Sequence, residues 1–189
     1  MGQPASKGSG FSSAVTTLRK LLPPETLERV IAPLSAPTAE LVRRPPLPVA
    51  WIDVSHFPEL VASVRAHAFG GEEAKYEEWG RQAMLGDLRT IYKVFIRFLS
   101  PQFVIDRGTK LWQTYTREQG NVRSVADGET AALVMYEGLP PTLVSPEFWA
   151  YQRGVLRGVM EATGMKHTTV TTIDGGVSAT HARFRVSWT

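Results

Sequence analysis

The chain has 189 residues, of which 43% are hydrophobic and 21% are charged, and its formal net charge is +3. This length and composition are typical of one folded domain and leave too little chain for two domains with separate cores. The absence of cysteine excludes disulfides, thiolate metal sites and cysteine nucleophiles, and it favours a cytoplasmic location. No stretch reaches the roughly 20 consecutive apolar residues that a membrane span needs.

The small basic excess lies at the front of the chain. The first fifty residues carry six basic and three acidic groups, and the rest of the chain is nearly balanced. A protein that binds nucleic acid usually concentrates its positive charge in a patch or stripe. We therefore expect no nucleic-acid partner.

The division of the chain follows from where glycine and proline gather. Residues 1–10 are rich in Gly, Ser, Pro and Gln, which predicts a flexible lead-in. Residues 11–189 are expected to form a single α/β domain. Within it, residues 11–48 are a helical, proline-rich arm that ends in an extended RRPPLP connector, and residues 49–189 are the core.

Apolar residues in the front half recur every three or four positions, which is typical of amphipathic helices. Pro33 and Pro37 are expected to break the chain after the second helix. Paired glycines or Ser-Pro steps mark further helix ends. The helices expected on this basis cover residues 12–22, 24 or 25 onward, 55–69, 72–99 (as one bent helix or two) and 102–118.

The last third of the chain changes to the two-residue period of strands. Asp127-Gly128 is a strong signal for a type I′ hairpin turn between the first two strands. The strands are expected over residues 122–126, 130–136, 167–173 and 181–188, with a helix over 146–163 between the two pairs. We therefore expect an α+β fold in which a helical N-terminal half packs on an antiparallel four-stranded sheet, built as hairpin, helix, hairpin.

The sequence displays no motif for catalysis, metal binding or nucleotide binding. The histidines (His56, His67, His167 and His181) are not spaced as ligands relative to one another or to a carboxylate. His67 lies on a predicted helix, from which a histidine can ligate haem, but a surface position is the expected one. We therefore expect no catalytic residue, no metal site, no cofactor and no enzymatic activity.

Two sets of side chains remain as candidates for binding. Aromatic rings at helical spacing usually form core, yet they can also line an apolar pocket between helices and sheet. Rows of basic residues usually face solvent, yet they can also meet an acidic partner. The candidate pocket residues are Trp79, Arg81, Tyr92, Phe95, Trp112, Tyr115 and Trp149. The candidate residues for an acidic partner are Arg89, Lys93 and Arg97 on a helix and Arg183 and Arg185 on the last strand.

Several stretches of the chain resemble a myxobacterial paralogous family of unknown function, from about Lys7 to Trp188. They are KGSGF at 7–11, WGR at 79–81, YKVFIRFLSPQF at 92–103 and FRVSW at 184–188. That family resembles the superfamily of 4-vinyl-reductase, haem-NO-binding and TRAPP-component domains. The resemblance implies helices packed on an antiparallel sheet, and a ligand sensor or an assembly scaffold that is often dimeric.

The chain departs from this superfamily where thiol or haem chemistry would be expected. Many relatives have a cysteine, Gly-Asp, cysteine, aromatic pattern before the last strand. Here Asp174 and Ala182 stand at the cysteine positions, and Ser178-Ala179 replaces Gly-Asp. The Tyr-x-Ser-x-Arg clamp for the haem propionates in haem-NO-binding domains is also missing. Arg81, the polar residue of the WGR match, has a simpler explanation as a partner of Glu77.

Two functions remain in competition. The first is a cytoplasmic sensor or regulatory module that binds a small apolar or amphipathic ligand between the helices and the sheet. The alternative is a dimeric protein-interaction or scaffold domain that has no small-molecule ligand and associates with a second copy of itself or with another signalling protein. An enzyme is the least expected reading, because no nucleophile and base are visible as a pair.

Overall fold

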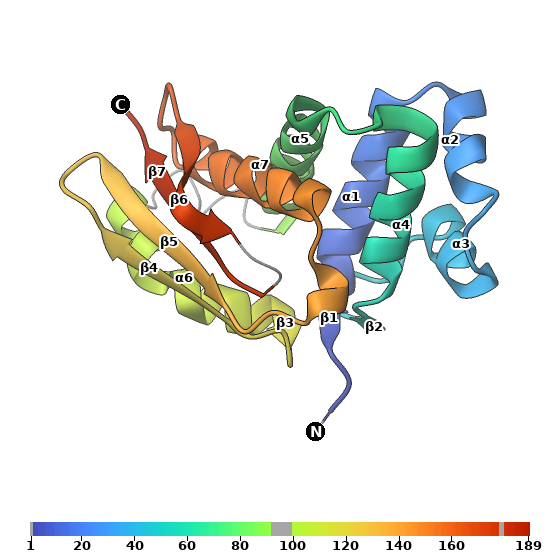
Figure 1. The fold of residues 1–189 in the computed structure, drawn as a ribbon, viewed down its shortest axis with the longest axis horizontal. Coiled ribbons are helices and arrows are strands. Elements are labelled where there is room, and N and C mark those ends of the chain that lie inside the picture. Colours follow the sequence, from blue (N-terminus) through green and yellow to red (C-terminus); the bar gives the residue numbers. More distant parts are fainter. Residues whose placement is uncertain (1, 92–99, 178–179) are drawn as a thin grey trace.

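The computed structural model describes residues 2–91, 100–177 and 180–189, and places a helical region at one end of the molecule and a sheet at the other (Figure 1). The helical region comes mostly from the first 70 residues of the chain, and a π-helical turn extends its last helix. Its members are α1 (Gly8–Leu21), α2 (Pro24–Ile31), α3 (Ala36–Arg43), α4 (His56–Val64) and the π-helical turn η1 (Arg65–Phe69).

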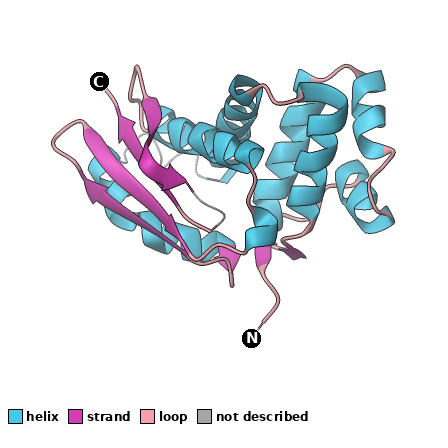
Figure 2. Cartoon of the chain, viewed as in Figure 1, coloured by secondary structure: helices cyan, strands magenta, loops and turns pink. Residues whose placement is uncertain are grey.

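A four-stranded antiparallel sheet forms the other end, with the strand order β4-β5-β7-β6 (Figure 2). Its strands are β4 (Asn121–Ala126), β5 (Ala131–Glu137), β6 (Thr169–Val177) and β7 (Ala182–Ser187). A short 3₁₀ turn, η3 (Pro141–Leu143), and helix α7 (Pro146–Ala162) join the two hairpins. The predicted α+β fold of hairpin, helix and hairpin is confirmed.

One face of this sheet is covered by helices. Val134 pairs with Phe184 and Tyr136 pairs with Ala182, and all four are buried on this inner face. Helices α6 (Pro101–Tyr115) and α7 both contact it, since Trp112 and Trp149 stack edge-on against the ring of Tyr136. The alternation predicted for the last strand therefore separates a core face from an exposed face.

The starts of α6 and α7 are determined by the same local sequence. Ser100 and Ser145 each stand just before a proline in the first helical turn. Their hydroxyls accept hydrogen bonds from the backbone N–H of Phe103 and Phe148, at 3.1 Å in both cases. A serine cap satisfies an otherwise free N–H, and proline has no N–H to satisfy.

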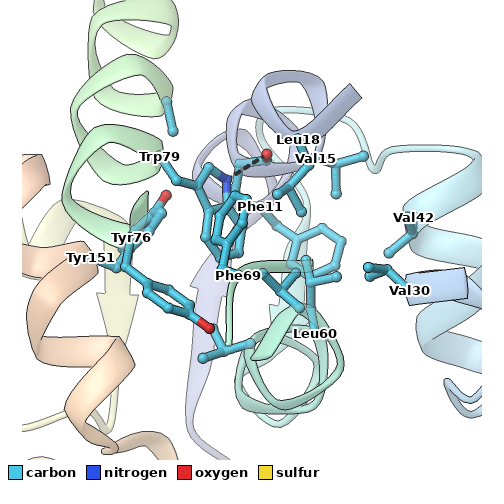
Figure 3. Packing of buried hydrophobic residues seen from close by; sticks show 14 of the residues in the cluster. Phe11, Val15, Leu18, Val30, Val42, Leu60, Phe69, Tyr76, Trp79 and Tyr151 are labelled. Atoms are coloured by element: carbon cyan, nitrogen blue, oxygen red, sulfur yellow. Dashed lines mark hydrogen bonds between the residues drawn. The ribbon is translucent and has the colours of Figure 1, made fainter. Parts of the chain in front are cut away.

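Buried apolar residues form two clusters. The helical cluster joins α1 to α4 with the first half of α5 (Glu73–Ile91), and Trp79 lies at its centre, fully buried (Figure 3). The indole Nε1 of Trp79 donates to the carbonyl oxygen of Ala14 at 2.9 Å. The sheet cluster joins α6, α7 and the inner face of the sheet, with Phe184 among its fully buried members. The molecule therefore has two packed centres rather than one.

Helices α5 and α7 cross at glycines. A Cβ atom on Gly80 would overlap the carbonyl oxygen of Tyr151, and one on Gly154 would overlap that of Glu77. Ion pairs flank this contact, with Arg153 Nε at 2.7 Å from Glu77 and Arg81 Nη1 at 2.7 Å from Glu161. Glycines on both helices therefore permit this close approach.

The N-terminal segment differs from the predicted flexible lead-in. Residues Ala5–Lys7 form β1, which pairs antiparallel with β2 (Trp51–Asp53) and with β3 (Thr116–Arg117). Helix α1 begins at Gly8, whose N–H donates to the carbonyl oxygen of Ala50 at 2.8 Å. Composition suggested mobility, but pairing with strands distant in the sequence satisfies this backbone.

Two further boundaries differ. Pro37 was expected to break the chain, but it lies in the first turn of α3, where a proline is tolerated. Helix α6 ends at Tyr115 rather than near Glu118, because the next two residues join the small sheet as β3. The predicted end of α5 near Leu99 lies outside the described residues. None of the helices in the described ranges is long and apolar enough to span a membrane.

Candidate functional site

A cavity of about 360 Å³ lies between the helical cluster and the sheet cluster. Phe11, Phe57 and Tyr151 line it from the helical side, and Val134 and Tyr136 line it from the inner face of the sheet. This volume is at the lower end of the range for small-molecule pockets. The cavity is thus the place where the two packed centres meet without filling the space between them.

Most of the wall consists of apolar side chains, and helices α5, α6 and α7 supply many of them. Several of them are only partly buried, and Leu111 is 40% exposed, so the cavity opens beside α6. Among the apolar helical residues of this wall are Met84 and Leu88 on α5, Val104 and Leu111 on α6, and Val155, Leu156 and Val159 on α7. A wall of this kind favours an apolar body over a polar one.

Most polar groups of the wall are already hydrogen-bonded within the protein. Gln119 Nε2 donates to the carbonyl oxygen of Ala5 at 2.7 Å, and the hydroxyl of Tyr136 donates to Gln152 Oε1 at 3.3 Å. Burial raises the pKa of the hydroxyls of Tyr136 and Tyr151, so both remain neutral phenols at physiological pH. These groups shape the cavity more than they offer free binding capacity.

Asp87 on α5 is the buried acidic residue of the described wall. It lines the cavity and is 7% exposed. Burial raises the pKa of its carboxyl, and a hydrogen bond from the side chain of Ser13 on α1 partly opposes that shift. None of the ion pairs among the described residues includes Asp87. Among the described residues, this carboxyl therefore has a hydroxyl partner but no ion pair of the kind that buried charges normally have.

The structure brings two of the predicted pocket residues to the cavity. Trp112 and Tyr115 both line it from α6, and the indole of Trp112 also donates to the carbonyl oxygen of Gly120 at 3.3 Å. Trp79 belongs to the packed centre of the helical cluster and Trp149 to that of the sheet cluster, and neither is among the lining residues.

Arg81, predicted for the pocket, also lies away from it. Its guanidinium pairs with Glu78 at 2.6 Å and Glu161 at 2.7 Å, whereas Glu77, the expected partner, pairs with Arg153. The remaining two pocket candidates, Tyr92 and Phe95, lie outside the described residues.

Of the two basic rows, the structure describes the side chains of the row on the last strand, Arg183 and Arg185. Arg185 Nε pairs with Asp127 at 2.7 Å across the exposed face of the sheet, and Arg183 borders a small hollow beside Glu137 and His181. On the helix, Lys93 and Arg97 and the side chain of Arg89 lie outside the described residues. Their role in meeting an acidic partner remains a prediction.

Sequence reasoning missed Asp87, although the sequence contains a signal for it. Tyr76, Trp79 and Ala83 are buried members of one helical stripe, and Asp87 continues that stripe one turn further. A carboxylate on the apolar face of a helix is unusual, since such groups are rarely buried without a partner. The pattern therefore marks residue 87 as a polar group inside the fold.

With the geometry in place, the fold can be compared with solved structures. It is similar to the Fe(II) unliganded H-NOX protein from K. algicida, with a TM-score of 0.66 and 10% identity over 97% of this chain and 96% of that chain. A second structure, described as modulating heme redox potential through protein-induced porphyrin distortion, has a TM-score of 0.68 and 14% identity. The match covers 96% of this chain and 94% of that chain. A third structure, concerned with the mechanism of H-NOX activation, has a TM-score of 0.65 and 15% identity, and the match covers 96% of both chains. No protein-family model and no curated protein matches the chain.

The TM-scores show a shared fold and, at these low identities, no more than that. The lining of the cavity decides whether haem fits. None of the histidines lines it: the ring of His56 is hydrogen-bonded to Thr38, and His67, His167 and His181 are exposed elsewhere. Among the described lining residues, Lys7 is the one basic side chain available for two propionates. No group of three metal-ligating side chains occurs in the described ranges. The residues present therefore do not fit a histidine-ligated haem.

Proposed function

We propose that this protein is a non-enzymatic cytoplasmic sensor or regulatory module that binds a small apolar or amphipathic ligand between its helices and its sheet. The observation that carries the proposal is the apolar cavity of about 360 Å³, lined on one side by Trp112 and Tyr115. The likeness to a structure concerned with H-NOX activation supports a switching role for a domain of this shape.

The size of the cavity argues for an occupant. Protein interiors are packed densely, and few voids in them exceed the volume of a water molecule. An apolar space many times larger leaves its lining without contacts on one side, which costs stability. A ligand with an apolar body restores those contacts and stabilises the folded state by binding to it.

Calorimetric titration with decanol tests the proposal, because decanol has an apolar chain of suitable length and no charge. We expect saturable binding at one site and a rise in the melting temperature of the protein. Val159→Phe should abolish both, because Val159 lines the cavity and a phenyl ring there occupies part of the space. Binding that is absent in the wild type, or that persists unchanged in Val159→Phe, would contradict the proposal.

The scaffold function is the second candidate, and one observation favours it. Leu47 and Val49, at the end of the proline-rich connector, are 73% and 74% exposed. Exposed apolar side chains mark a contact site between proteins where they belong to one contiguous patch. If this is the function, light scattering should show a dimer that Val49→Ser disrupts, and decanol should have no effect on melting. A strict monomer would leave the sensor as the sole candidate.

A further inference from the structure

Asp87 places one buried carboxyl group in the otherwise largely apolar wall of the cavity. Asp87 lines the cavity together with Met84, Leu88 and Tyr151, and its carboxyl accepts a hydrogen bond from the side chain of Ser13. One hydroxyl satisfies only part of what an ionised carboxylate accepts. The remaining acceptor capacity is available to a ligand that enters the cavity.

The described lining contains two other charged side chains, Lys7 and Asp53, and each has contacts of its own. The Nζ of Lys7 donates to the carbonyl oxygen of Val49 at 3.3 Å and lies 4.3 Å from the centre of the Trp51 ring. Asp53, the other acid of the lining, accepts hydrogen bonds from the hydroxyl and the N–H of Ser55, which lower its pKa. Asp53 thus has its own partner, and Lys7 is held on the side of β2.

These contacts give the cavity an electrostatic preference. The described lining contains two carboxylates and one ammonium group, so an anionic ligand would meet repulsion at Asp87. A neutral ligand would leave the carboxylate with no counter-charge from the described residues. A cationic group would supply the missing charge and donate hydrogen bonds, and charge-assisted bonds of this kind are the strong ones.

Resting on the proposed function, we propose that the ligand of this cavity has an apolar body ending in a protonated amine, and that the amine pairs with the carboxylate of Asp87. The apolar body occupies the space among α5, α6, α7 and the sheet. The chemical class is therefore that of a primary alkyl- or arylalkylamine of moderate size, rather than a fatty acid or a neutral lipid.

Titration of wild-type protein with decylamine, decanol and decanoate, all below their micelle concentrations, tests the inference. The three probes share a chain and differ in the charge of the head group. We expect decylamine to bind at least about tenfold more tightly than decanol, and decanoate to bind most weakly. Binding of none of the three would contradict the proposed function. Equal binding of decylamine and decanol would overturn this inference and leave the proposed function standing.

Variants then test which carboxylate pairs with the amine of the ligand. Asp87→Asn keeps the shape of the side chain and removes its charge, so it should bring the affinity for decylamine down to that for decanol. Asp127→Asn, a matched substitution on the exposed face of the sheet, should leave the preference unchanged. If Asp53→Asn rather than Asp87→Asn removes the preference, the amine pairs at the other carboxylate and the assignment is wrong.

The dependence of binding on pH provides a second readout. Decylamine remains protonated well above neutrality, as a lysine side chain does. Its affinity should therefore fall as the pH drops through the raised pKa of Asp87 and the carboxylate is neutralised. The other titratable groups of the described lining are Lys7, Asp53, Tyr115, Tyr136 and Tyr151. The pH dependence should disappear in Asp87→Asn, and its persistence there would contradict the pairing.

Discussion

The two halves of helix α5 have different surroundings: the first half is packed in the helical cluster, and the second half borders the cavity. The first half carries Tyr76, Trp79 and Ala83, which are almost fully buried among the other helices, and its backbone touches that of α7 at Gly80. The second half carries Met84, Asp87 and Leu88, which line the cavity. One helix therefore provides both the rigid centre of the molecule and one wall of the candidate site.

This difference shows how a small domain can keep a cavity without losing its fold. The crossing of α5 and α7 combines close backbone contact, a buried indole and flanking ion pairs. Such contacts hold the two helices in place, so the side chains beyond the crossing need not fill the remaining space. Binding and catalytic sites are commonly built this way, on rigid elements that are stabilised elsewhere.

The largest effect is expected at the crossing itself. Gly154→Ala should destabilise the protein by about 3 kcal/mol, because the added Cβ would overlap the carbonyl oxygen of Glu77 and force the helices apart. Urea unfolding measures the loss. Gly86→Ala, on the exposed side of α5 where a Cβ meets nothing within 4 Å, should instead stabilise by about 0.5–1 kcal/mol. Equal effects at the two positions would contradict the tight crossing.

The next largest difference is expected between larger side chains placed in the packed centre and larger side chains placed in the cavity. Ala83→Leu places three extra carbons in the packed centre and should cost about 1–3 kcal/mol. Val159→Phe adds volume to the cavity and should change the free energy of unfolding by less than about 1 kcal/mol. The comparison fails if Val159→Phe proves the more destabilising of the two in thermal or urea denaturation.

A smaller effect, dependent on pH, is expected at Asp87. The folded state raises the pKa of this carboxyl above its ordinary value of 3.8, so the folded protein holds the proton more tightly than the unfolded chain does. The stability contributed by Asp87 is therefore present at low pH and lost as the pH rises through the raised pKa. Asp87→Asn should match the wild type below about pH 4 and become the more stable protein towards neutrality.

Urea midpoints of wild type and Asp87→Asn at a series of pH values test this prediction. Glu59 is a useful contrast, because hydrogen bonds from Thr38 and Ser35 outweigh its burial and lower its pKa. The stability from Glu59 is present above its ordinary pKa and lost as the pH falls through the lowered value. If the wild-type protein instead becomes more stable than Asp87→Asn as the pH rises, Asp87 has a cationic partner in the folded state, and the prediction is wrong.

The smallest effect is expected on the outer face of the sheet. Arg185→Ala removes a half-exposed ion pair with Asp127 and should change the free energy of unfolding by no more than about 0.5 kcal/mol. Binding of decanol should not change, because Arg185 does not line the cavity. A large loss of stability or of decanol binding would give this residue a role that its contacts do not suggest.

The sequence was sufficient to predict the fold but only part of the site. Period changes and turn residues identified both hairpins and the helix between them, because local backbone preference and burial agree there. The strand at Ala5–Lys7 was missed because its partners are distant in the sequence, so no local pattern records the pairing. Trp112 and Tyr115 line the cavity and Trp79 does not, but the helical spacing of aromatic residues in the sequence does not distinguish the three.

Asp87 shows where local reasoning stops. Its place on the buried stripe of α5 is visible in the sequence, but whether such a carboxyl meets a cation, a hydroxyl or a cavity depends on α1 and α7, which come from distant parts of the chain. The ion pairs of Arg81 illustrate the same limit, since Glu161 is eighty residues away. Long-range packing, rather than propensity, decides which polar groups remain available to a ligand.

The central claim is that the cavity between the two packed clusters takes up a small apolar or amphipathic molecule. Methionine-methyl NMR during a decanol titration tests it directly, because Met84 and Met160 line the cavity whereas Met135 and Met165 do not. We predict saturable shifts of the Met84 and Met160 methyl signals, with Met135 on the outer face of the sheet unchanged. The absence of saturable shifts at Met84 and Met160, or shifts of equal size at Met135, would contradict the account.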